Sequence, residues 1–139
     1  MSARMITITR TDLHRLTEIL DSELTLAIVG QRAHLRELRE NLQRATVVES
    51  PDMLPDVVTM NSTVYVHDLD RSETDVYTLV YPEEACIAEG KLSILSPLGV
   101  EILGRRVGEA VTVHVLDRES RKRIDKLSFQ PERVGAFHL

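Results

Sequence analysis

The chain has 139 residues, of which 42% are apolar and 28% are charged, and these values fit one globular domain with or without a small helical appendage. Its net charge of −5 argues against broad binding to nucleic acid, which depends on lysine and arginine contacts to phosphate. A single cysteine excludes an internal disulfide, no apolar run approaches the roughly 20 residues that span a bilayer, and no secretion signal is recognisable. We therefore expect a cytoplasmic protein without membrane contact.

Two leucine stripes at helical spacing occupy the first third of the chain. Leu13, Leu16 and Leu20 form the first stripe, and Gly30 is the natural break after it. The second stripe, which follows Arg32, consists of Leu35, Leu38, Leu42 and Ala45. Together they predict a short antiparallel helical hairpin, coiled-coil-like, within residues 1–48. Two helices packed on a larger core would carry the same pattern.

A linker and a strand-rich region follow. Residues 49–56 contain Pro51 and Pro55, which prevent a helix from continuing and favour extended backbone. After them, runs rich in β-branched and aromatic residues predict strands near 57–60, 63–66, 76–80, 111–116 and 124–129. Polar turns are expected at 68–73 and 118–121. Residues 57–139 are therefore expected to form an α+β domain of antiparallel sheet with one short helix.

The sequence predicts both the start and the end of that short helix. The hydroxyl of Ser96 can cap the first turn, and Pro97 suits the first helical position because its missing N–H is not needed there. Gly104 can adopt the left-handed conformation that ends a helix.

The segment 96–109 resembles the C-terminal domain of the Gre-type transcription factors, together with 56–62 and 81–85. The resemblance covers most of residues 56–131, and the order and spacing of these motifs are more specific than any one of them. The short N-terminal helices and the tail Gln130-Pro131-Glu132 favour the Rnk-type branch, the regulators of nucleoside diphosphate kinase. The resemblance implies an FKBP-like fold that docks at the rim of the RNA polymerase secondary channel. It also implies that the N-terminal helices point into that channel.

The same resemblance implies particular site residues. The docking surface would include Ser96, Pro97, Leu98 and Gly99. Full-length Gre factors use acids at the coiled-coil tip to help hold a second Mg²⁺ at the polymerase active centre, and Asp21 and Glu23 are the possible tip acids here. The family's tip motif is missing and the helices are shorter. We therefore expect an RNA polymerase regulator that competes with Gre-type factors without stimulating transcript cleavage.

Two alternatives remain open. The first is a Gre-like cleavage factor that uses the tip acids. The second is an FKBP-like peptidyl-prolyl isomerase, for which five aromatic residues spread along the chain are poor material.

No pattern predicts a catalytic centre, a cofactor or a metal site. The five histidines are scattered, and Cys86 lies beside acidic residues that do not lower the pKa of a thiol. The acidic turn at 68–73 lacks the glycine and the final glutamate of a calcium-binding EF-hand loop. The basic residues at 118–123 are most simply a solvated hairpin tip, so we expect no sequence-specific nucleic-acid binding. Because no catalytic pattern is present, we also expect that the protein is not an enzyme.

Overall fold

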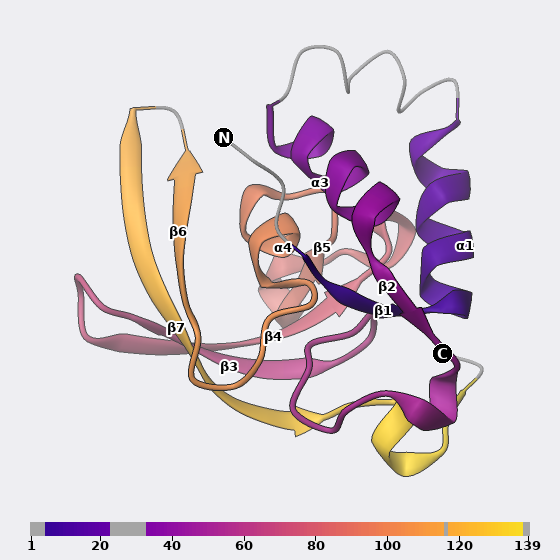
Figure 1. Cartoon of the computed structure of the whole chain (residues 1–139). Coiled ribbons are helices and arrows are strands. Elements are labelled where there is room, and N and C mark those ends of the chain that lie inside the picture. Colours follow the sequence, from indigo (N-terminus) through magenta and orange to yellow (C-terminus); the bar gives the residue numbers. More distant parts are fainter. Residues whose placement is uncertain (1–4, 23–32, 116, 138–139) are drawn as a thin grey trace.

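The computed structural model describes residues 5–22, 33–115 and 117–137, and within them helices and two sheets form an α+β structure (Figure 1). This confirms the predicted α+β class. The α-helices are α1 (Arg10–Leu20), α3 (Ala33–Arg44) and α4 (Pro97–Ile102). The strands are β1 (Thr7–Thr9), β2 (Thr46–Val48), β3 (Thr63–Asp68), β4 (Glu73–Val80), β5 (Lys91–Ser93), β6 (Ala110–Val115) and β7 (Arg118–Phe129).

The larger sheet has five strands in the order β5-β4-β3-β7-β6. Its pairs are antiparallel except at one edge, where β5 runs parallel to β4. The expectation of a wholly antiparallel sheet was wrong at this edge. The chain reaches β5 through two short 3-10 turns at Pro82–Glu84 and Ile87–Glu89, a connection that allows a parallel return.

Two further expectations were wrong in detail. Residues 57–60 form no strand, because Val57 makes only an isolated bridge to Arg106 and the backbone turns at Asn61, where φ is +65°. The β-branched residues of this segment lie in a turn and are buried in the core. Their pattern therefore indicates burial rather than pairing between strands. Residues 118–121 are not the hairpin tip, since β7 already begins at Arg118 and pairs there with Val115. Leu116 lies outside the described residues.

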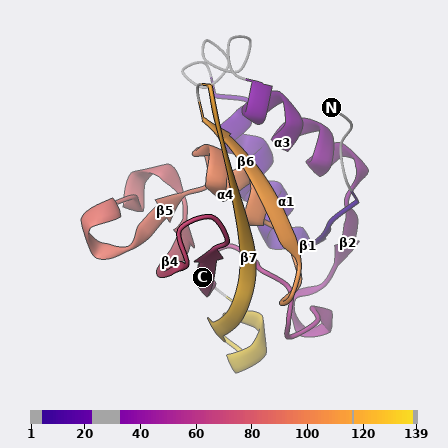
Figure 2. The same cartoon turned by 90° about the vertical axis from the view of Figure 1, so that its left-hand side faces the viewer.

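The core lies between one face of the larger sheet and the helices. Leu16 and Leu20 of α1 are buried in the same cluster as Val64 of β3 and Ile124 of β7. The leucines of α3 in this cluster are Leu35, Leu38 and Leu42. The sheet curls around α4, and α1 and α3 run in opposite directions across the core (Figures 1 and 2). The two leucine stripes thus belong to helices packed on a larger core, the second arrangement that their pattern allows.

A two-stranded sheet closes the base of the helical pair. β1 and β2 run parallel, with Thr7 opposite Thr46 and Thr9 opposite Val48. The strand β1 leads directly into α1, and β2 follows α3 (Figure 1). The helix α3 ends at Arg44, so Ala45, the last residue of the second stripe, lies outside the helix, and β2 begins at Thr46.

Candidate functional site

The start of α4 has the predicted caps. The hydroxyl of Ser96 accepts a hydrogen bond of 3.1 Å from the backbone N–H of Gly99 and donates one of 2.7 Å to the carbonyl of Ser93. Pro97 is the first helical residue, and Gly104 lies in the left-handed region with a φ of +78°. These hydrogen bonds stabilise a short helix that would not form from its intrinsic helix propensity alone.

Gly99 packs closely against the backbone of Ser93 and Ile94. A Cβ placed on Gly99 would lie 2.2 Å from the carbonyl oxygen of Ser93 and 3.1 Å from the Cα of Ile94. Both neighbours are backbone atoms, so they cannot rotate away. Glycine at this position therefore allows α4 to pack against the end of β5.

The structure brings the four sequence-predicted docking residues together at the start of α4. Gly99 is buried, and Ser96 uses its hydroxyl inside the cap. Pro97 and Leu98 are half-buried, and Leu98 packs against the core. Within this motif, Ser96 and Gly99 shape the backbone, whereas Pro97 and Leu98 offer side-chain surface.

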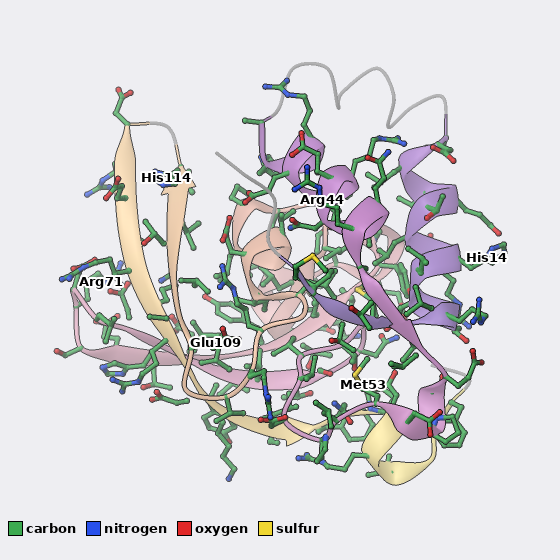
Figure 3. All side chains as sticks on the ribbon, viewed as in Figure 1. His14, Arg44, Met53, Arg71, Glu109 and His114 are labelled. Carbon is green, nitrogen blue, oxygen red and sulfur yellow. The ribbon has the colours of Figure 1, made fainter. Side chains whose placement is uncertain are left out.

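Pro97 also lines a groove of about 420 Å³ between α3, α4 and β6, which we call the α3–α4 groove. Its lining residues are Ala33, His34, Arg36, Glu37, Glu40, Pro97, Glu101 and His114. His34 fixes one wall, because its Nε2 lies 2.9 Å from the carbonyl oxygen of Leu95. His114 lies on β6, across from α3 (Figure 3).

Sequence reasoning missed the part of this groove that α3 provides. The signal was present, because positions 33, 36, 37 and 40 recur at the spacing of one helix face. That face is charged rather than apolar, so a search for leucine stripes passes over it.

Asp21, the first of the two possible tip acids, lies at the end of α1. Asp21 caps the C-terminal end of α1, and its Oδ1 accepts a bond of 3.1 Å from the guanidinium of Arg39. Arg39 also donates to the carbonyl of Leu20 at 2.8 Å. An acid at a helix C-terminus is electrostatically unfavourable, and the Arg39 cation on α3 offsets it. Glu23 lies outside the described residues.

A buried carboxylate joins α1 to the rest of the protein, and sequence reasoning missed it as well. Asp12 is 1% exposed and accepts hydrogen bonds from the backbone N–H of Met60 at 3.2 Å and from the Tyr81 hydroxyl at 3.4 Å. Burial, with a further contribution from the Glu132 charge, raises the pKa of Asp12 to about 7. The Arg15 guanidinium lies 5.9 Å from the centre of the Tyr81 ring. Burial also raises the pKa of Tyr81.

The basic strand β7 is balanced by acids. Arg121 binds Asp70 at 2.8 Å, and Arg123 binds Asp125 at 2.6 Å. Lys122 lies 3.1 Å from Asp68, and its hydrogen bond is the main reason that the pKa of Asp68 falls to about 2. These acids neutralise the basic residues of β7, which disfavours a surface that collects phosphates.

Neither a metal site nor a membrane-spanning helix is present within the described ranges. No three side chains of His, Cys, Asp or Glu come close enough there to hold a metal ion. No described helix has the length and apolar character needed to cross a membrane.

Comparison with known protein families gives two matches along the chain. The model of the transcription elongation factor GreA/GreB C-terminal region matches residues 53–128, and that of the Rnk N-terminus matches residues 4–48.

Individual proteins agree with this assignment. The regulator of nucleoside diphosphate kinase of Escherichia coli K12 is 35% identical over 103 residues, which cover 73% of this chain and 76% of that protein. GreA of Chloroherpeton thalassium is 41% identical over 83 residues, which cover 60% of this chain and only 52% of that protein. The structure of a prokaryotic GreA/GreB factor from Nitrosomonas europaea superposes with a TM-score of 0.74 at 31% identity, covering 91% of this chain and 99% of that one. The chain therefore belongs to the GreA/GreB transcription elongation factor family, in its Rnk-type branch.

Proposed function

We propose that this protein is a cytoplasmic transcription regulator that binds RNA polymerase at its secondary channel and competes there with Gre-type factors. In this proposal residues 57–139 form the docking domain, residues 49–56 form the linker, and residues 1–48 form the arm. The arm occupies the channel without stimulating transcript cleavage.

The observation that carries the docking role is the capped start of α4. Ser96 and Gly99 hold the backbone in one conformation through two hydrogen bonds and a close approach to Ser93. Pro97 and Leu98 are thereby presented on a rigid turn, which reduces the ordering cost of binding a partner. A surface of this kind, in a member of this family, supports polymerase docking at these residues.

The absence of cleavage stimulation is supported by the dimensions and charges of the arm. Its described helices have 11 and 12 residues, so each is about 17 Å long at 1.5 Å per residue. Asp21 is already paired with Arg39 at 3.1 Å. Because Mg²⁺ has strict requirements for ligand distance, a short arm and a paired acid are a poor means of delivering a carboxylate to a remote active centre.

We also propose that the docking domain has an FKBP-like fold but no prolyl isomerase activity. A prolyl isomerase needs an aromatic-lined pocket that excludes water. The α3–α4 groove and a smaller groove of about 170 Å³ between α1 and α3 contain no Phe, Tyr or Trp in their linings. Fold alone does not confer the activity.

Fluorescence anisotropy of the labelled protein with purified RNA polymerase tests the proposal directly. We expect binding, displacement by an unlabelled Gre factor, and weaker binding by the double variant Pro97→Ala/Leu98→Ser. Val134→Ser is the control, because Val134 is an apolar residue, 60% exposed, in the short turn Glu132–Val134 and lies outside α4. Absence of binding at micromolar concentrations would refute the proposal. Binding that a Gre factor does not displace would refute the secondary-channel site.

A further inference from the structure

The turn at the start of α4, residues 93–99, is shaped by hydrogen bonds within itself, and we call it the docking turn. The hydroxyl oxygen of Ser93 accepts from the N–H of Leu95 at 3.0 Å, and the carbonyl of Ser93 accepts from the hydroxyl of Ser96 at 2.7 Å. These bonds span two or three positions, so they fix the curvature of the docking turn. Its orientation depends on contacts with other elements.

Hydrogen bonds to β4 and from α3 orient the docking turn. Near its start, the N–H of Ile94 donates to the carbonyl of Val80, the last residue of β4, at 2.9 Å. In its middle, the carbonyl oxygen of Leu95 lies 2.9 Å from Nε2 of His34, which precedes it by 61 positions on α3. Since a carbonyl oxygen can only accept, the ring nitrogen carries the proton and donates it. The arm therefore supplies one anchor of the docking turn.

The helix α3 is a firm support for this bond. Leu35, the neighbour of His34, is 2% exposed, and Leu38 is 0% exposed. Both leucines belong to the main core cluster. His34 and Leu95 are half-buried, so water competes less for their hydrogen bond than it would at an exposed site. Because α4 has only six residues, its position depends on tertiary contacts such as this one.

We infer that His34 is a positioning residue for polymerase docking: its bond to the Leu95 carbonyl fixes the orientation in which the docking turn presents Pro97 and Leu98 to the partner. This inference rests on the proposed polymerase docking and extends it to a residue of the arm. A turn that is already held in one orientation loses less conformational entropy on binding. Through His34 the arm contributes to the affinity of docking, in addition to its occupation of the channel.

Two substitutions of His34 test this inference in the anisotropy assay. His34→Ala removes the donor, and we expect polymerase binding to weaken by about fivefold, the effect of losing one hydrogen bond. His34→Gln keeps an N–H donor that can reach the Leu95 carbonyl, so its binding should stay within about twofold of that of the unaltered protein. His14→Ala is the matched control, because it is the same change at an exposed position of another arm helix, α1.

Hydrogen exchange gives a second readout that does not depend on polymerase. The N–H of Gly99 is bonded to the Ser96 hydroxyl at 3.1 Å and reports the order of the docking turn. It should exchange faster in His34→Ala and at the unaltered rate in His34→Gln. Thermal unfolding of each variant distinguishes this local effect from a general loss of stability.

The outcomes separate this inference from the proposed function. If His34→Ala binds like His14→Ala while Pro97→Ala/Leu98→Ser binds more weakly, the docking site stands and the role of His34 is wrong. If His34→Gln binds as weakly as His34→Ala, and Gly99 exchanges at the unaltered rate in both, His34 contacts the polymerase directly and is not a positioning residue. If the unaltered protein does not bind polymerase, the proposed function and this inference fall together.

Discussion

The hydroxyl of Tyr81 donates a hydrogen bond of 3.4 Å to Oδ1 of Asp12, and this contact ties α1 to the residue that follows β4. The second oxygen of Asp12 accepts from the backbone of Met60, so the carboxylate spans three parts of the chain. Such a group has little access to water, and its charged form is poorly solvated. The pKa of about 7 follows mainly from this burial.

Replacing Asp12 with asparagine should stabilise the protein at alkaline pH. The carboxyl's pKa is about 7 in the folded state against 3.8 ordinarily, so the folded state holds the proton more tightly. Its contribution to stability is complete below pH 4 and is lost as the pH rises through about 7, a difference on the order of 4 kcal/mol. Urea unfolding at pH 5, 7 and 8.5 should show Asp12→Asn losing less stability with rising pH than the unaltered protein.

The control for that measurement is Asp52→Asn, which changes an exposed carboxylate in the turn Ser50–Asp52. It should leave the pH dependence of the unfolding free energy unchanged. Parallel pH curves for Asp12→Asn and the unaltered protein would show that the Asp12 carboxyl is ionised without penalty in the folded state.

Gly99→Ala should destabilise the protein by about 3 kcal/mol, because the new methyl group would lie 2.2 Å from the Ser93 carbonyl oxygen and force the backbone apart. Ser96→Ala removes only the cap at the same place and should cost about 1 kcal/mol. Urea unfolding of both variants gives the comparison. A Gly99→Ala protein as stable as Ser96→Ala would mean that α4 shifts freely and that its start is not rigid.

Gln130→Leu should loosen the segment between the arm and β3. The Gln130 side chain is fully buried, and its Nε2 donates to the carbonyls of Leu54 at 2.8 Å and Val57 at 2.7 Å. Leucine would leave both carbonyls without these donors, at a cost of about 2 kcal/mol or more in unfolding free energy. Hydrogen exchange should then become faster in residues 54–58. Ser128→Ala, an exposed neighbour, serves as the control, and equal exchange in both variants would contradict the role assigned to Gln130.

Asp21→Ala should not change the protein's effect on a stalled elongation complex. The unaltered protein is expected to leave the transcript intact, because the Asp21 carboxylate is paired with Arg39 at the end of α1. The assay follows RNA length over time, with a Gre factor as the positive control. Transcript shortening by the unaltered protein that Asp21→Ala abolishes would establish the cleavage alternative instead.

Patterns that depend on local chemistry were predictable from the sequence. The cap at Ser96, the proline at the first helical position and the left-handed Gly104 each require only neighbouring residues, and all three were confirmed. The strands β3, β4, β6 and β7 also followed from their composition, although β7 is longer than expected.

Features that depend on distant residues were not predictable. A run such as 57–60 has the composition of a strand, yet whether it pairs depends on which partner edges are available, and here Val57 finds only Arg106. The short parallel strands β1, β2 and β5 have three residues each, which is too few for an alternating apolar pattern to be recognised in the sequence. The burial of Asp12 depends on Tyr81 and Met60, which follow it by 69 and 48 positions.

The parallel pairing of Thr7 with Thr46 has a consequence for how this family can vary. Adjacent strands lie roughly 4.8 Å apart, so the start of α1 and the end of α3 are held side by side. Leu16 of α1 and Leu38 of α3 also pack on the core of the larger sheet, so the helical pair is anchored both at its base and along its length. Helical turns added at the far ends of α1 and α3 would leave the pairing of β1 with β2 and these core contacts unchanged. The length of the helical pair can therefore vary while its base stays the same.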